Sequence, residues 1–218
     1  MSETSPLRWG ILGCGRIARA LAKAMQATPT AQLVAITSRS QERADAFASE
    51  FDVPRSHGSY EAVLANPEVE AVYIATVHPE HAEWAIKAAE AGKHILCEKP
   101  VTMNLGEAEQ VIAAAEANKV FFMEAFMYRW HPQFAKVVEI LQSGMLGELR
   151  LIESHFCFHP EYKPTDRLFN KGLGGGAILD IGCYPMSMAR RLAGIAMGKA
   201  FANPIELKGI GHLDKGTG

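Results

Sequence analysis

Three ionisable side chains in this sequence have the chemistry needed to orient a hydroxyl group and move its proton: Lys99, Asp180 and Tyr184. Lys99 belongs to Glu98-Lys99-Pro100, directly after a short apolar run, and a lysine there can hold a substrate oxygen or move a proton. Taken alone, a Glu-Lys pair is more often a surface ion pair. Asp180 and Tyr184 are four residues apart on an expected helix, so we predict that they share a face that lines a cleft.

A glycine-rich turn near the N-terminus indicates a dinucleotide site. The pattern Gly13-x-Gly15-x-x-Ala18 follows an apolar run and precedes a helical pattern. Gly13 permits the tight turn, Gly15 lets a pyrophosphate approach the backbone, and Ala18 allows close helix–strand packing. The first amides of the helix would then bind the anion, and Arg16 either contacts the phosphates or points to solvent. The alternative is a glycine turn that serves packing alone.

The segment after the second expected strand bears on the choice between NAD and NADP. An NAD enzyme usually places Asp or Glu there, to accept a hydrogen bond from the ribose 2′-hydroxyl. This chain has Thr37-Ser38-Arg39-Ser40 and no acid before Glu42. A guanidinium can bind a 2′-phosphate with two hydrogen bonds, although Arg39 could also be a solvated loop charge. The sequence favours NADP and leaves NAD or dual use open.

The elements that must position these residues change character near residue 124. Residues 1–123 alternate short apolar runs with helical stripes, which predicts an α/β fold: a Rossmann domain with a doubly wound parallel sheet. Residues 124–218 predict an incomplete α+β domain with an open, mostly antiparallel sheet, built on strands at 149–158 and 205–213. The second domain looks too small to cover its own sheet, so we expect the chain to be a fragment, truncated at its C-terminus.

Composition and charge exclude several other classes of protein. The 218 residues carry a formal net charge of −2 without a long basic run, which argues against nucleic-acid binding. No stretch reaches the roughly 20 apolar residues that span a bilayer, and the N-terminus has no signal-peptide pattern. The four cysteines are dispersed, which argues against a disulfide framework and favours the cytoplasm. His78 and His81 are three residues apart, but no third ligand completes a metal site.

The motifs together resemble those of the glucose–fructose oxidoreductase/inositol dehydrogenase (Gfo/Idh/MocA) family. The matching segments are the glycine turn from Gly10 to Ala18, VYIAT at 72–76, Glu98-Lys99-Pro100 and GGGAILDIGCYP at 174–185. Residues 78–81, 124–129 and 183–185 are most similar to the dimeric dihydrodiol dehydrogenase and NADP-dependent D-xylose dehydrogenase branch. Many family members carry His where this chain has Tyr184. Family members are also about half as long again as this chain.

The resemblance implies an NADP-dependent oxidoreductase that transfers a hydride between nicotinamide and a CH–OH group of a sugar, polyol or dihydrodiol. It also implies that Lys99, Asp180 and Tyr184 form the catalytic group. A free phenol has a pKa of about 10, so Tyr184, the predicted acid/base, needs the Lys99 cation beside it. Which of the two moves the proton stays open. Asp180 either orients the substrate hydroxyl or holds Lys99, and Pro100 is a candidate for a cis peptide bond.

The resemblance also supplies the wider set of binding residues. The predicted cofactor-binding residues are Gly13, Gly15, Arg16, Ile17, Ser38, Arg39, Thr76, His78, His81, Glu98 and Lys99. The predicted substrate-binding residues are Arg129, Asp180 and Tyr184, with an interdomain salt bridge as the alternative for Arg129. The expected partners are a small polyhydroxylated substrate and, for the full-length chain, further copies in a homodimer or higher oligomer. The competing function is a non-catalytic dinucleotide-binding scaffold or sensor, or an inactive fragment of such an enzyme.

Overall fold

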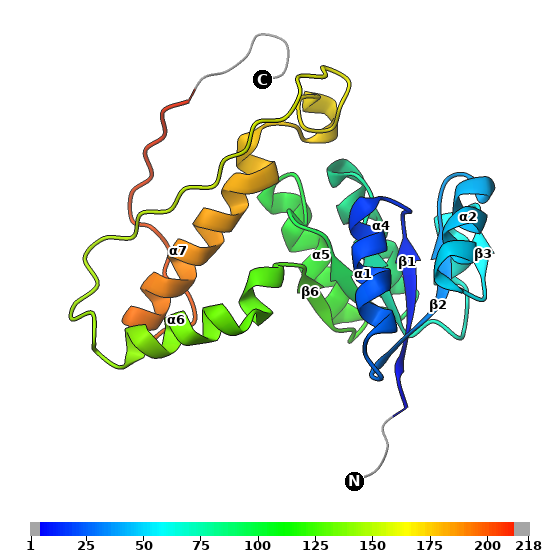
Figure 1. The fold of residues 1–218 in the computed structure, drawn as a ribbon, viewed down its shortest axis with the longest axis horizontal. Coiled ribbons are helices and arrows are strands. Elements are labelled where there is room, and N and C mark those ends of the chain that lie inside the picture. Colours follow the sequence, from blue (N-terminus) through cyan, green and yellow to red (C-terminus); the bar gives the residue numbers. More distant parts are fainter. Residues whose placement is uncertain (1–4, 212–218) are drawn as a thin grey trace. The chain divides into compact units, whose positions relative to one another are not determined.

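The computed structural model describes residues 5–211, and the chain forms two compact units (Figure 1). Unit 1 spans Met1–Ala125 and unit 2 spans Phe126–Gly218. Unit 1 contains every β-strand found among the described residues, whereas unit 2 is built from helices and extended segments.

The sheet of unit 1 has six parallel strands in the order β3-β2-β1-β4-β5-β6. This order, with its reversal between β1 and β4, is that of a doubly wound dinucleotide-binding sheet, which confirms the predicted Rossmann fold. The strands are β1 (Leu7–Leu12), β2 (Ala31–Thr37), β3 (Ser56–His57), β4 (Ala71–Ile74), β5 (His94–Cys97) and β6 (Phe122–Glu124).

Helices cover both faces of this sheet because successive strand residues point to opposite sides. Ile11 packs with Ala22 and Phe47 on the face covered by α1 and α2. Its neighbour Leu12 packs with Ala85 on the opposite face, covered by α3, α4 and α5. The helices of unit 1 are α1 (Arg16–Gln26), α2 (Gln41–Phe51), α3 (Tyr60–Leu64), the 3₁₀ turn η1 (His78–Glu80), α4 (His81–Glu90) and α5 (Leu105–Ala117).

Side-chain caps mark the starts of two of these helices. The Arg43 N–H donates to the Ser40 hydroxyl at the start of α2, and the Glu107 N–H donates to Asn104 Oδ1 at the start of α5. Glu107 in turn accepts from the Met103 N–H, one residue before the position that an ideal capping box uses. These side chains satisfy backbone donors that the helix itself leaves unpaired.

Unit 2 is arranged around two helices. Tyr128, on a short 3₁₀ turn, packs edge-on against Phe134 of α6 and lies 6.4 Å, ring to ring, from Tyr184 of α7. The elements of this unit are η2 (Met127–Trp130), α6 (Pro132–Gln142), η3 (Lys171–Leu173), the π-helical segment η4 (Ile178–Gly182) and α7 (Cys183–Ala196).

The two strands predicted in the second domain are wrong for the residues described. Residues 149–158 and 205–211 have no strand structure, and residues 212 and 213 of the second predicted strand lie outside the described part. The expected antiparallel sheet is therefore not formed within residues 126–211. The physical reason is that a strand is stabilised by hydrogen bonds to a neighbour, and alternating polarity alone does not supply one.

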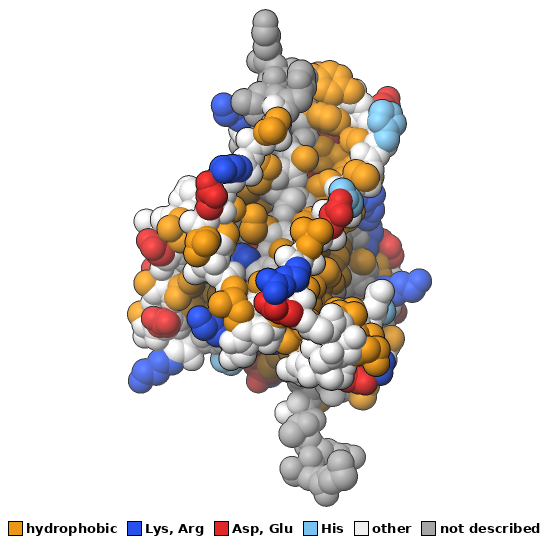
Figure 2. Space-filling model, turned by 90° about the vertical axis from the view of Figure 1, so that its left-hand side faces the viewer, with side chains coloured by type: hydrophobic (Ala, Val, Ile, Leu, Met, Phe, Trp, Pro, Cys, Tyr) orange, Lys and Arg blue, Asp and Glu red, His pale blue; other side chains and the backbone are white. Residues whose placement is uncertain are grey.

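Without a sheet, unit 2 leaves many apolar side chains in contact with solvent. Figure 2 shows hydrophobic side chains over a broad area of the face it presents. The large exposed side chains of unit 2 include Leu151, Phe156, Phe158, Ile178, Met197, Ile205, Leu207 and Ile210. None of the helices within residues 5–211 is long and apolar enough to cross a membrane.

Candidate active site

The glycine turn after β1 has the geometry that the sequence predicts. Gly13 adopts φ +105°, and a Cβ added there would lie 2.6 Å from the carbonyl oxygen of Ala75. Its N–H donates to the Thr37 carbonyl oxygen at 2.9 Å, which ties the turn to the end of β2. Ala18 is fully buried between α1 and the sheet. Only glycine fits the Gly13 position, because both the backbone angle and the space exclude a side chain.

The start of α1 fits the phosphates of a dinucleotide. A Cβ on Gly15 would meet no heavy atom within 4 Å, so the backbone there is open to a ligand. Gly15 is also the N-cap of α1, no side chain caps the helix, and its first turn contains no acid. Arg16 and Ile17 are both exposed at this end. Unpaired amides and the positive end of the helix dipole favour an anion at such a position.

The predicted 2′-phosphate residues follow β2. Ser38 is buried, whereas the Arg39 side chain is 73% exposed. Arg39 Nη1 donates to Glu80 Oε1 at 3.2 Å, a contact between the loop after β2 and η1. Sequence reasoning missed Glu80, because no local pattern links residues 41 positions apart.

The residues predicted after β4 lie on one short stretch of backbone. His78 is buried, and its ring meets that of His81 edge-on at 5.7 Å. His81 is fully buried: its Nδ1 lies 2.8 Å from the carbonyl oxygen of Pro100 and its Nε2 lies 3.3 Å from that of Thr76. His81 therefore joins the loop after β4 to the loop after β5. Among the described residues, no group of three His, Cys, Asp or Glu side chains is arranged to hold a metal.

Burial lowers the pKa of the His81 imidazole below its ordinary value, although its two carbonyl neighbours act in the opposite direction. The unfolded chain then binds a proton that the folded chain excludes, so the stabilisation is complete above the unfolded pKa of about 6.5 and falls below it. We expect the free energy of unfolding to decrease by up to about 1 kcal/mol from pH 7.5 to 5.5 on this account. Urea unfolding at both pH values measures it, with His81→Asn as the comparison. A decrease of equal size in His81→Asn would contradict the assignment.

Lys99 lies on a loop that several side chains hold in place. The Tyr73 hydroxyl donates to Glu98 Oε1 at 2.5 Å, and the Val101 N–H donates to Glu124 Oε1 at 3.0 Å. The Lys99-Pro100 peptide bond is cis, as the sequence allowed. The Glu98 N–H also donates to the Ile74 carbonyl oxygen, so the loop continues from the edge at which β4 ends. Sequence reasoning missed the role of Tyr73, although a phenol within the apolar run AVYI signals a hydroxyl that needs a partner.

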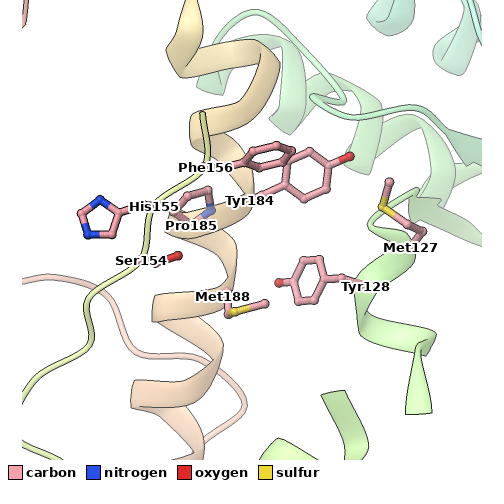
Figure 3. A pocket seen from close by; sticks show the side chains of 8 residues that line it. All are labelled: Met127, Tyr128, Ser154, His155, Phe156, Tyr184, Pro185 and Met188. Carbon is pink, nitrogen blue, oxygen red and sulfur yellow. The ribbon is translucent and has the colours of Figure 1, made fainter. Parts of the chain in front are cut away.

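Tyr184 lines a cavity of about 340 Å³ in unit 2 (Figure 3). Its ring packs against those of Phe156 at 5.4 Å and Phe126 at 5.5 Å, and the close-up shows Phe156 beside it. The residues that line the cavity are Met127, Tyr128, Ser154, His155, Phe156, Tyr184, Pro185 and Met188. Aromatic and thioether side chains therefore surround the predicted acid/base, with only a few polar groups among them.

Asp180 is held by a charged partner that the sequence did not reveal. Arg167 Nη1 donates to Asp180 Oδ1 at 2.9 Å, and the carboxylate side chain is 9% exposed. Asp180 lies in the π-helical segment Ile178–Gly182, where hydrogen bonds span five residues rather than four. The α-helical spacing from which we predicted a face shared with Tyr184 is therefore not present across this segment.

Arg129 is engaged within unit 2. Its Nη2 donates to the Ser187 hydroxyl at 2.7 Å, and the Tyr128 hydroxyl lies 2.8 Å from the same oxygen. The guanidinium also lies over the rings of Phe126 and Phe201, at 4.9 Å and 5.3 Å from their centroids. These contacts fix Arg129 to α7 and give it a packing role of its own, so its predicted substrate contact stays a prediction.

The fold and the glycine turn define the class of Rossmann dinucleotide-binding proteins. Comparison with family models narrows this class. The model described as "Oxidoreductase family, NAD-binding Rossmann fold" matches residues 7–126, and that of the "GFO/IDH/MocA C-terminal domain" matches residues 134–203. The chain belongs to the Gfo/Idh/MocA family of oxidoreductases, as the motifs indicated.

Individual relatives cover most of this chain. Trans-1,2-dihydrobenzene-1,2-diol dehydrogenase of Mus musculus is 38% identical over 82% of this chain and 54% of its own length. D-xylose 1-dehydrogenase (NADP(+)) 2 of Haloferax volcanii is 39% identical over 86% of this chain and 58% of its own. A 3-ketoreductase from Actinomadura kijaniata, crystallised with NADP and TDP-benzene, matches with a TM-score of 0.77 at 35% identity, covering 86% of this chain and 57% of that one. The chain thus spans little more than half the length of the curated relatives it matches.

Proposed function

We propose that this chain is the NADP-binding part, and carries the catalytic residues, of an oxidoreductase. The reaction is hydride transfer between nicotinamide and a CH–OH group of a sugar, polyol or dihydrodiol. The observation that carries the proposal is the uncapped start of α1 at Gly15, open to a ligand at the edge where β1, β4 and β5 end. The relatives' printed activities, a dihydrodiol dehydrogenase and an NADP-linked xylose dehydrogenase, support the same reaction class.

The cofactor, when bound, supplies or accepts the hydride. The α1 amides bind its pyrophosphate, and Arg39 binds the 2′-phosphate through its guanidinium. Thr76 and the η1 residue His78 follow β4, and Glu98 follows β5. From these positions they would contact the rest of the cofactor. Tyr184 exchanges the proton of the substrate hydroxyl, and Lys99 supplies the positive charge that the catalytic group requires. Asp180 orients the substrate hydroxyl, and Arg167 keeps this carboxylate in position.

Two measurements on the purified chain test the proposal. Isothermal titration calorimetry is expected to show binding of NADP⁺, and the absorbance of reduced nicotinamide is expected to change when aldoses, inositols or dihydrodiols are added. Binding with no turnover across that panel would favour the competing function instead, a scaffold or sensor or an inactive fragment of such an enzyme. The absence of dinucleotide binding would refute both.

A further inference from the structure

The guanidinium proposed to bind the 2′-phosphate already has an anionic partner within unit 1. Arg39 Nη1 donates to Glu80 Oε1 at 3.2 Å. Arg39 follows β2 and Glu80 belongs to η1, after β4, and β1 lies between these two strands in the sheet. The ion pair therefore reaches across the end of β1, at which the glycine turn begins.

The Arg39–Glu80 pair belongs to a local cluster of polar and charged groups that also includes Tyr60 and Arg43. Burial raises the pKa of the Tyr60 phenol, the nearby Glu80 carboxylate raises it further, and Arg39 and Arg43 act in the opposite direction. The Glu80 side chain is 25% exposed, compared with 73% for Arg39. Water therefore screens the carboxylate less than it screens the guanidinium, and Glu80 is the more buried member of the pair.

We propose that Glu80 is a specificity-determining residue of the dinucleotide site, whose carboxylate neutralises Arg39 and restrains the preference for a 2′-phosphate over a 2′-hydroxyl. The inference rests on the proposed function, since it requires the chain to bind a nicotinamide dinucleotide. A phosphate that binds Arg39 must compete with the Glu80 carboxylate for the same guanidinium, so Glu80 weakens the binding of the phosphate. A ribose hydroxyl, by contrast, can donate a hydrogen bond to a carboxylate.

The position of Glu80 compensates for an acid that the end of β2 lacks. NAD-binding proteins of this fold usually hold the 2′-hydroxyl with an acid from that position. Here Ser38-Arg39-Ser40 occupies it, and the carboxylate comes instead from η1. Arg39 thus favours a 2′-phosphate and Glu80 favours a 2′-hydroxyl. The ion pair between them reduces the effect of Arg39 on the choice of cofactor.

Calorimetric titration of NADP⁺ and NAD⁺ into the 218-residue chain and its Glu80→Gln variant tests the inference. We expect Glu80→Gln to lower the Kd for NADP⁺ by about three- to fivefold, as removal of one partly exposed charge predicts, and to leave the Kd for NAD⁺ unchanged or raise it by less than about twofold. Glu80 makes no side-chain cap at the start of α4, so the substitution leaves the helix start intact. Glu83→Gln is the matched control, because it removes the same charge from α4 and breaks the pair with Lys87 instead of the pair with Arg39.

A variant that lacks the Arg39 charge shows whether Glu80 acts through Arg39. In Arg39→Gln, the further change Glu80→Gln is expected to alter the Kd for NADP⁺ by less than twofold. An undiminished gain there, an equal gain for both dinucleotides, or no change in the single variant would each overturn the inference. Tight NADP⁺ binding by the unaltered chain keeps the proposed function intact in those cases. If the unaltered chain binds neither dinucleotide, both proposals are refuted.

Discussion

Replacing Tyr184 with phenylalanine is expected to lower kcat/KM by about 10²- to 10⁴-fold, the usual contribution of a positioned acid/base group. The substitution removes one oxygen and keeps the ring, which packs against Phe126 and Phe156 at 5.5 Å and 5.4 Å. The fold of unit 2 and the dinucleotide site of unit 1 should therefore be unaffected. The initial rate of nicotinamide oxidation or reduction, measured with the best substrate of the unaltered chain, gives the effect on turnover.

Tyr128→Phe is the matched control for this prediction. Its phenol also lines the cavity beside Tyr184, but it is engaged with Ser187 at 2.8 Å. Loss of that hydrogen bond should reduce stability by about 1 kcal/mol and change turnover little. If the two variants lose turnover equally, or if Tyr184→Phe also loses its affinity for NADP⁺, Tyr184 is not the acid/base group.

The fold of unit 1 could be predicted because its signals are local. Apolar runs, helical stripes and caps such as Ser40 and Asn104 each lie within a few residues of the element they define. Sequence reasoning missed Ser56–His57 and Tyr60–Leu64, since a strand of two residues and a helix of five are too short to show a period. The prediction of a strand at 149–158 was wrong for a different reason. The alternation of polar and apolar residues indicates which side chains would face the core of a sheet, but strand pairing depends on residues far away in the chain.

The residues of the candidate site also fall into those that the sequence could predict and those that it could not. The glycine turn was predicted because its residues are adjacent and the conformation of Gly13 follows from its neighbours. The pairs Arg39–Glu80 and Arg167–Asp180 join residues 41 and 13 positions apart, and neither separation belongs to a helical or strand period. Such pairs are decided by tertiary packing, so the sequence named one member of each and left the other unidentified. Each missing partner carries the opposite charge and so changes what the named residue can do.

Replacing Gly13 with alanine is expected to destabilise unit 1 by about 2–3 kcal/mol and to weaken NADP⁺ binding at least about tenfold. The added Cβ would lie 2.6 Å from the Ala75 carbonyl oxygen, a backbone atom that cannot rotate away, and φ is +105°. The turn must move, which breaks the alignment of the Gly13 N–H with Thr37 and shifts the first amides of α1. Urea unfolding measures the first effect and calorimetry the second.

Alanine substitutions at two other glycines separate the loss of stability from the loss of NADP⁺ affinity. Gly92→Ala also places a side chain at a positive φ, +70°, but meets no atom within 4 Å, so it should cost about 1 kcal/mol and leave NADP⁺ affinity unchanged. Gly15→Ala has φ −75° and open space, so it should preserve stability and lower affinity alone, because the methyl group occupies the position of the phosphates. Gly13→Ala therefore lowers both stability and NADP⁺ affinity, whereas Gly92→Ala lowers only stability and Gly15→Ala lowers only affinity. Full affinity in Gly15→Ala would mean that the pyrophosphate does not bind at this turn.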